Sequence, residues 1–171
     1  MLEPQNSPPA RDDLIQRLMH AMWSAGQAMK RDVAPLLARE HGMEFKHYVL
    51  LDRVASGALY PRELSTCLAL PPSHISRVLD ELSGHGLLRR SLDPHDSRRV
   101  RLEITPQGHA LLEATRATMT QVVEQGLAAF SLEEVRTVTS ALERIAAAMQ
   151  ESGNGPCPQP QRPEELEESQ P

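Results

Sequence analysis

Residues 61–108 read PRELSTCLALPPSHISRVLDELSGHGLLRRSLDPHDSRRVRLEITPQG, and the hydrophobic period changes within this stretch. The first part predicts a short helix over Pro61–Leu68, because proline is favoured in a first helical turn. Pro71 and Pro72 then indicate a turn. A second helix is predicted from about Pro72 to Ser83, since its apolar residues recur at helical spacing. Those residues are Ile75, Val78, Leu79 and Leu82.

The second half of the stretch follows the period of a β-strand. After Gly84 and Gly86, Leu87–Leu92 predicts one strand. Arg99–Ile104 alternates polar and apolar residues, as a half-buried strand does. Asp93–Ser97 lies between them and has the composition of a turn. The two segments therefore predict a β-hairpin with a charged tip.

Two helices are predicted before this stretch. Apolar residues three or four positions apart predict the first from Asp12 to about Glu40, with Pro35 as a candidate kink. Gly42 is a plausible end to it. The second helix is predicted over Glu44–Ser56, where Gly57 follows as a stop signal.

Two more helices are predicted after the hairpin. Thr105 as a cap and Pro106 as the first helical residue restart the helix, which should run to about Ala129. Ser131 and Glu134 then have the spacing of a capping box, and the last helix should reach Gln150. The fold class predicted from these elements is mainly α with a small β-hairpin.

The two ends of the chain differ in composition from this body. Residues 1–10 contain three prolines and no periodic pattern, which predicts a disordered leader. Residues 151–171 are rich in proline and glutamate, which predicts a disordered acidic tail. No signal peptide and no run of 18 apolar residues is found, so we expect a cytoplasmic protein without a membrane partner.

Net charge is the main objection to nucleic-acid binding. The chain has 18 Lys and Arg against 23 Asp and Glu, a formal net charge of −5. Much of the excess lies after residue 150, where five acidic residues meet one arginine. Within residues 71–105, six arginines meet five acidic residues, a net of +1. The charge therefore does not exclude a nucleic-acid partner for this region.

Metal and enzyme chemistry find little support in the sequence. The two cysteines, Cys67 and Cys157, exclude a disulfide framework and a cysteine-based zinc site. The seven histidines lack metal-ligand spacing, so we expect no metal and no cofactor. No nucleophile elbow, phosphate loop or carboxylate pair is present, which argues against an enzyme. Cys67 is interpreted as a small buried thiol.

A short helix, a tight turn, a second helix and a hairpin follow one another in the order of a winged helix-turn-helix. The residues that carry this order resemble the MarR family of transcriptional regulators. The matching segments are Pro61–Leu64, Ile75–Leu82, Gly86–Arg90, Asp93–Arg99 and Ile104–Gly108. The resemblance covers about residues 12–150. It implies a MarR-type domain over 11–150, with dimerisation helices at 11–41 and 105–150 and the winged helix-turn-helix at 44–104.

The resemblance assigns DNA-binding roles to residues of the second helix and of the hairpin, or wing. Arg98 is the wing arginine expected to enter the minor groove, and Asp96 is expected to aim it. The expected contacts to base edges and phosphates come from Ser73, His74, Ser76 and Arg77. Further phosphate contacts are expected from Arg89, Arg90, Arg99 and Arg101. An ordinary surface ion pair between Arg98 and Asp96 is the competing interpretation.

The helix after the turn departs from the family pattern. The family often places Ser or Asp before Pro as the cap, whereas here Pro71 precedes Pro72. The cap then falls to Ser73 or is absent. His74 replaces a smaller Thr, and a solvent-facing histidine competes with one that reads a base.

The resemblance also implies a homodimer on a pseudo-palindromic operator, with two recognition helices roughly 34 Å apart. Repression by occluding a promoter is expected. Many relatives bind aromatic acids in a cleft, for which the candidate residues are Trp23, His47, Tyr48 and Leu51. Tyr48 and Leu51 are also plain core candidates. Val49 stands where the urate-responsive branch has an acidic residue, so urate is not the expected effector.

A winged-helix module used for protein–protein contact is the alternative function. Such a module does not need arginines at the tip of the wing. This chain has Arg98, Arg99 and Arg101 there, which favours DNA as the partner.

Overall fold

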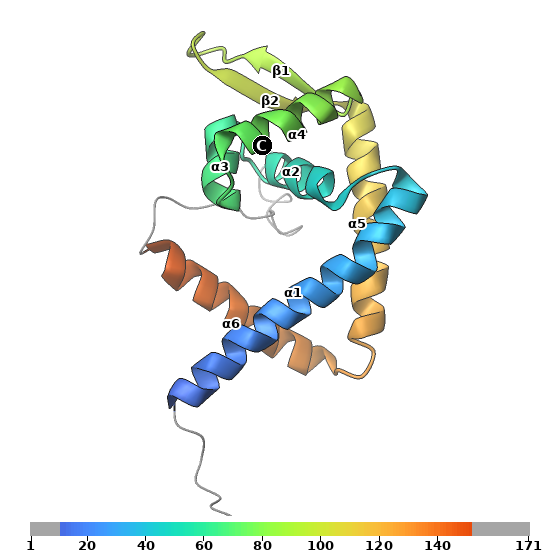
Figure 1. Ribbon diagram of the computed structural model, residues 1–171, viewed down its shortest axis with the longest axis vertical. Helices are drawn as coiled ribbons and strands as arrows, with labels where there is room; N and C mark the ends of the chain where they lie inside the picture. Colours follow the sequence, from blue (N-terminus) through green and yellow to red (C-terminus); the bar gives the residue numbers. More distant parts are fainter. Residues whose placement is uncertain (1–10, 152–171) are drawn as a thin grey trace, which may run out of the picture.

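The fold is described from a computed structural model, in which residues 11–151 can be described. The predicted leader and, from residue 152, the predicted tail lie outside the described residues. The elements are α1 (Arg11–His41), α2 (Phe45–Ala55), α3 (Pro61–Leu68), α4 (Pro72–Gly84), β1 (Leu88–Leu92), β2 (Val100–Ile104), α5 (Pro106–Gly126) and α6 (Leu132–Glu151) (Figure 1). The predicted fold, mainly α with a β-hairpin wing, is confirmed.

An aliphatic core lies between α2, α3, α4 and the hairpin. The inner face predicted for α4 is fully buried, and Leu50, Leu51 and Val54 of α2 pack in the same cluster. Leu102 of β2 and Leu112 of α5 belong to the same cluster. Burial of one such leucine contributes on the order of 1.5–3 kcal/mol, so this cluster holds α4 firmly with one face outward.

The hairpin has the predicted antiparallel pairing. Leu88 pairs with Ile104 and Leu92 with Val100, and the seven residues between the strands form the tip. Leu102 also donates its N–H to the carbonyl oxygen of Leu59 at 2.8 Å, which joins β2 to the segment before α3. The base of the wing is thus buried, whereas Leu92 near its tip is 67% exposed.

Glycines shape the turns after α1 and α4, and Thr105 joins α4 to α5. Gly42 and Gly86 adopt positive φ angles of 60° and 69°, a region that favours glycine, and they follow α1 and α4. Thr105 caps α5 as predicted, since its Oγ1 accepts from the Gly108 N–H at 3.0 Å. The same hydroxyl donates to the Gly86 carbonyl oxygen at 2.7 Å, which joins the end of α4 to the start of α5.

Three details differ from the sequence-based expectations or resolve them. Pro71 occupies the cap position of α4 and forms no side-chain cap hydrogen bond, so of the two alternatives, a cap at Ser73 or no cap, the structure has the second. The α5 helix ends at Gly126 rather than near Ala129, because the chain tightens there: the Leu127 N–H bonds to Glu124 and the Ala128 N–H to Gln125, each three residues back. Cys67 is half-buried rather than buried, since α3 lies at the surface.

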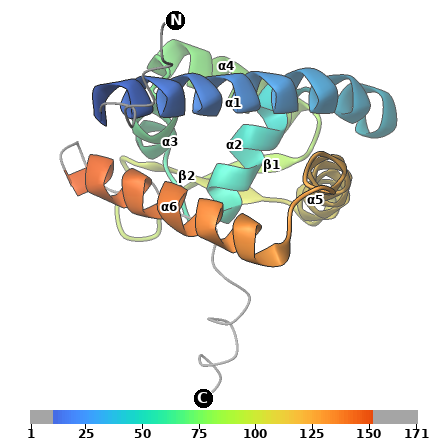
Figure 2. The ribbon, with the colours of Figure 1, turned by 90° about the horizontal axis from the view of Figure 1, so that it is seen from below.

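The long helices α1 and α6 extend away from the winged region. They overlap in Figure 1, but Figure 2 shows them on opposite sides of the molecule. The α1 helix is joined to α5 by a hydrogen bond of 2.8 Å between His41 Nε2 and Thr118 Oγ1. Among the described residues, no helix has both the length and the apolarity that a membrane crossing needs.

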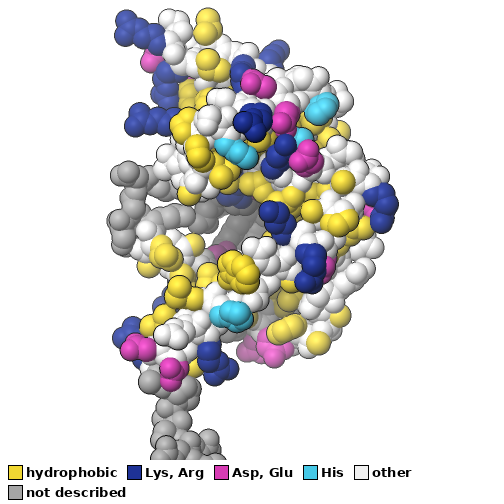
Figure 3. All heavy atoms as spheres, in the orientation of Figure 1, with side chains coloured by type: hydrophobic (Ala, Val, Ile, Leu, Met, Phe, Trp, Pro, Cys, Tyr) yellow, Lys and Arg dark blue, Asp and Glu magenta, His cyan; other side chains and the backbone are white. Residues whose placement is uncertain are grey.

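Large apolar side chains remain exposed along α1, α6 and the turn between α5 and α6. Trp23 and Met149 are 65% and 71% exposed. The others in this set are Leu14, Ile15, Leu18, Met19, Met22, Met29, Phe130, Leu132, Val138 and Leu142. Figure 3 shows apolar patches over these two helices. A set of this size is more than scattered exposure explains.

We predict that Gly108→Ala destabilises the winged region. An added β-carbon at this position would lie 2.0 Å from the Leu87 carbonyl oxygen and 2.7 Å from a methyl carbon of Ile104. Relieving that overlap should lower the free energy of unfolding by about 1–3 kcal/mol. Urea unfolding followed by circular dichroism measures it.

Gly126→Ala is the matched control, because no heavy atom lies within 4 Å of an added β-carbon there. It should be neutral or slightly stabilising, since alanine loses less backbone entropy in a helix than glycine. Equal stability of both variants would contradict the close contact at Gly108.

Candidate nucleic-acid interface

The outer face of α4 carries the four side chains predicted to meet DNA. Ser73, His74, Ser76 and Arg77 are all exposed. Ile75 between them is fully buried, so the core fixes which face of the helix is outward. The structure thus brings these four residues together on one polar surface, and their contacts to bases stay a prediction.

Polar contacts also hold α4 on α2. Glu81 Oε2 accepts from Lys46 Nζ at 2.7 Å and from His47 Nε2 at 2.8 Å. The hydrogen bond from Lys46, followed by that from His47, lowers the pKa of the Glu81 carboxyl to about 2. His47 is buried at this contact, and it therefore helps to position α4. Sequence reasoning missed this pairing.

Asp93 organises the tip of the wing. Its Oδ1 accepts from the N–H groups of His95 and Asp96 at 2.7 and 3.0 Å. Its own N–H donates to the Arg99 carbonyl oxygen at 3.0 Å, and the Arg99 N–H donates to Asp96 at 2.9 Å. The predicted turn is therefore closed by four hydrogen bonds, three of which involve Asp93.

Arg98 lies at the outer end of this tip. The Asp96 Oδ1 accepts from the backbone N–H of Arg98 at 3.0 Å. The Arg98 side chain is exposed and takes part in none of the ion pairs formed by the described residues. Asp96 thus acts on the backbone of Arg98, and the competing side-chain ion pair is absent from the structure.

The other predicted arginines differ in how far they are engaged. Arg89 forms an ion pair with Glu103 at 2.6 Å, and Arg90 forms one with Asp80 of α4 at 2.8 Å. Arg101 is half-buried, and its Nε lacks a hydrogen-bond partner among the described residues. Figure 3 shows basic side chains around the end of the molecule that carries the wing.

Tyr60 is a residue of this region that sequence reasoning missed. Its hydroxyl donates to Asp93 Oδ2, and the Arg99 guanidinium carbon lies 3.7 Å from the centre of its ring. The hydrogen bond to Asp93 raises the pKa of the Tyr60 phenol and lowers that of the Asp93 carboxyl. A tyrosine at a helix cap position, where Ser, Thr, Asp or Asn is usual, was the available signal.

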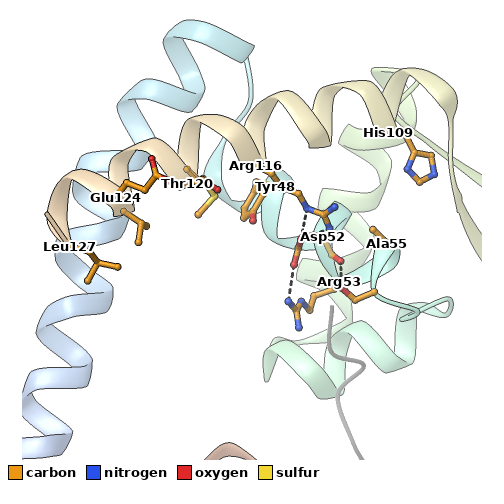
Figure 4. A pocket seen from close by; sticks show the side chains of 12 residues that line it. Tyr48, Asp52, Arg53, Ala55, His109, Arg116, Thr120, Glu124 and Leu127 are labelled. Atoms are coloured by element: carbon orange, nitrogen blue, oxygen red, sulfur yellow. Dashed lines mark hydrogen bonds and ion pairs between the residues drawn. The ribbon is translucent and has the colours of Figure 1, made fainter. Parts of the chain in front are cut away.

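A cavity of about 850 Å³ lies between α2 and α5 (Figure 4). At its wall, buried Asp52 accepts from Arg116 at 2.9 Å and from Arg53 at 2.7 Å. The full lining is Tyr48, Asp52, Arg53, Ala55, Ser56, His109, Arg116, Met119, Thr120, Val123, Glu124 and Leu127. Burial, and then the charge of Asp52, raises the pKa of the Tyr48 phenol. The cavity therefore combines apolar walls with cationic donors.

Of the four residues predicted for a ligand pocket, Tyr48 lines this cavity and the other three lie elsewhere. Leu51 is part of the aliphatic core. His47 bonds Glu81 beneath α4, and Trp23 is exposed on α1. The competing interpretation of Leu51 as core thus agrees with its position. Sequence reasoning missed Asp52 and Arg116, which lie 64 positions apart.

Comparisons with known proteins agree with this architecture. The model of the MarR family matches residues 41–99. The multiple antibiotic resistance protein MarR of Salmonella typhimurium is 31% identical over 98 residues, which make up 57% of this chain and 68% of that protein. A mutant MarR from E. coli complexed with operator DNA has a TM-score of 0.63 at 23% identity, over 80% of this chain and 99% of that one.

A ligand-bound structure is also similar. An organohalide-sensing transcriptional regulator in its 2,4-dichlorophenol-bound form has a TM-score of 0.64 at 16% identity. The similarity covers 86% of this chain and 89% of that chain. At these identities, the two solved structures show a shared fold.

We predict that Glu81 contributes to the pH dependence of stability. Because folding lowers its pKa from 4.5 to about 2, the contribution is present above pH 4.5 and is lost as the pH falls toward 2. Glu81→Gln should lower the free energy of unfolding at pH 6. It should also make the fall of that free energy between pH 4.5 and 2, here called the acid limb, less steep. Urea unfolding at a series of pH values measures this.

Glu40→Gln is the control, because Glu40 pairs with its exposed neighbour Arg39, and such pairs contribute little. It should keep the acid limb of the wild type. An acid limb in Glu81→Gln as steep as that of the wild type would contradict the role of Glu81.

Proposed function

The chain belongs to the MarR family of transcriptional regulators, and we propose that it is a homodimeric repressor released from its operator by a small aromatic acid. The observation that carries the DNA-binding part is the joint placement of α4 and the wing at one end of the molecule (Figure 1). The exposed polar face of α4 and the exposed Arg98 belong to this end. Both are attached to a buried core.

In DNA binding, α4 and the wing would contact different grooves. The outer face of α4 fits the major groove, where Ser, His and Arg side chains meet base edges and phosphates. The Arg98 guanidinium suits the negative potential of the neighbouring minor groove. Arg89 and Arg90 would contact phosphates in addition to their carboxylate partners, because ion pairs at exposed positions are weak.

The exposed apolar side chains of α1 and α6 support a homodimer. A two-fold axis would let the same helices of both copies cover one another, which is the commonest symmetry of soluble oligomers. We assign residues 11–41 and 105–150 to dimerisation and residues 44–104 to the winged helix-turn-helix. The α5 helix joins the two parts, since Leu112 is in the core while Val123 is exposed. A pseudo-palindromic operator follows from the two-fold axis.

The cavity between α2 and α5 supports a small-molecule effector. Its aliphatic wall and Tyr48 would contact an aromatic ring, and the Arg116 guanidinium would bind a carboxylate. Such a ligand would have to share Arg116 with Asp52, the buried carboxylate of α2. A similarly folded regulator is known in a form bound to 2,4-dichlorophenol. Competition for Arg116 would alter the contact between α2 and α5. That change would alter the spacing between the winged regions of the two copies.

We predict that Arg98→Ala weakens operator binding by more than about tenfold, because a charged side chain in the minor groove is lost. The variant should stay dimeric by sedimentation equilibrium. Fluorescence anisotropy with duplex selected from genomic fragments, at several salt concentrations, measures the affinity.

Arg31→Gln, which removes an exposed arginine of α1, is the control and should bind like the wild type. Unchanged affinity in Arg98→Ala would remove the minor-groove role. Wild-type binding to operator that is no tighter than to scrambled duplex, without a salt slope, would favour a protein-binding module instead. A monomeric mass for the wild type would contradict the dimer.

We further predict that benzoate releases the protein from operator, with an increase of about fivefold or more in the apparent Kd. Benzyl alcohol, which lacks the carboxylate, should have a smaller effect. Arg116→Gln should abolish the response to benzoate, whereas Arg31→Gln should retain it. A full response in Arg116→Gln, or none in the wild type, would contradict this effector site.

A further inference from the structure

Tyr60 connects the start of α3 to the tip of the wing. Its backbone is fixed at the cap position of α3, where its N–H donates to Glu63 Oε2 at 3.2 Å. Its carbonyl oxygen accepts from the Glu63 N–H at 3.0 Å. With the backbone held in this way, the side chain leaves the helix and reaches the wing, 33 positions further along the chain.

The Tyr60 side chain makes two different contacts with the wing. The hydroxyl donates a hydrogen bond to Asp93 Oδ2 at the start of the tip. The ring face lies under the Arg99 guanidinium at the end of the tip, with 3.7 Å from the guanidinium carbon to the ring centre. One rigid side chain thus holds both ends of the tip loop.

These contacts continue to Arg98 through the loop. The second oxygen of Asp93 holds the N–H of Asp96, and the Asp96 carboxylate holds the N–H of Arg98. Three successive hydrogen bonds therefore lead from the Tyr60 hydroxyl to the Arg98 backbone. Apolar burial gives this part of the wing little support, since Leu92 and Val100 are 67% and 40% exposed. An isolated two-stranded hairpin is marginally stable in water.

We infer that Tyr60 is a positioning residue for DNA binding, which fixes the wing tip so that Arg98 is held in place before DNA arrives. The inference rests on the proposed function. A tip that is already ordered loses less conformational entropy on binding than a mobile one. Tyr60 itself does not contact DNA in this role, because its hydroxyl and its ring face are both turned toward the wing.

The first test does not involve DNA. Hydrogen exchange of the full-length protein is followed by mass spectrometry for Tyr60→Phe, which keeps the ring and loses the hydroxyl. We expect amides of residues 93–99 to exchange about tenfold faster, as the loss of one hydrogen bond to a charged group implies. Peptides from α4 and α5 should be unchanged. Unchanged exchange at 93–99 would overturn the inference.

Thr118→Val is the control, because it also removes a single hydroxyl, which bonds His41 at 2.8 Å and the Ala114 carbonyl oxygen at 3.4 Å, far from the wing. It should leave exchange at 93–99 unaltered. Tyr60→Leu removes the ring as well as the hydroxyl, so exchange there should be faster still than in Tyr60→Phe. Melting temperatures of the variants are measured as well. If they fall in the same order and faster exchange is not confined to residues 93–99, the variants are generally destabilised and the inference is overturned.

The second test measures operator affinity. Tyr60→Phe should weaken binding by about fivefold, and Thr118→Val should not. In the Arg98→Ala background, Tyr60→Phe should have no further effect, because the residue that it positions is gone. An equal loss in both backgrounds would overturn the inference. If the wild type shows no preference for operator, the proposed function fails, whereas the exchange experiment still decides whether Tyr60 holds the wing.

Discussion

Burial of one aliphatic face of α4 is the contact on which the proposed DNA-binding surface depends. Ile75, Val78, Leu79 and Leu82 are at most 1% exposed, and this burial decides which side chains point outward. Glu81 adds direction to the apolar contact, since it accepts hydrogen bonds from two neighbouring residues of α2. Apolar packing tolerates small rotations, while hydrogen bonds to charged groups restrict them. The two together give α4 a defined orientation.

The elements of the fold were largely predictable, because hydrophobic period and cap residues are local signals. The helical spacing of α4, the alternation in β2 and the Thr105 cap all led to the observed structure. The polar contacts of the site were not predictable. Tyr60 with Asp93, Glu81 with His47, and Asp52 with Arg116 join residues 33 to 64 positions apart. Such pairs have no period, so only the fold brings them together.

Polar contacts engage some arginines of the site and leave others exposed. The count of six arginines against five acidic residues in 71–105 treats every arginine alike. In the structure, Arg89 and Arg90 have carboxylate partners and Arg99 stacks on Tyr60, whereas Arg98 is exposed without an ion pair among the described residues. Arg77, like Arg98, is exposed and takes part in no ion pair among the described residues. Under the proposed function, an uneven distribution of this kind favours selection of a binding site by shape and base contacts over strong attraction to any duplex.

The position of the apolar helices along the chain has a consequence for biosynthesis. The first and last described helices, α1 and α6, carry the apolar surface, and the winged region lies between them in sequence. A ribosome therefore makes one half of this surface before the winged region and the other half after it. A nascent chain cannot present the complete surface until the winged region has emerged. In the proposed dimer, translation order would let the winged region fold before two copies associate.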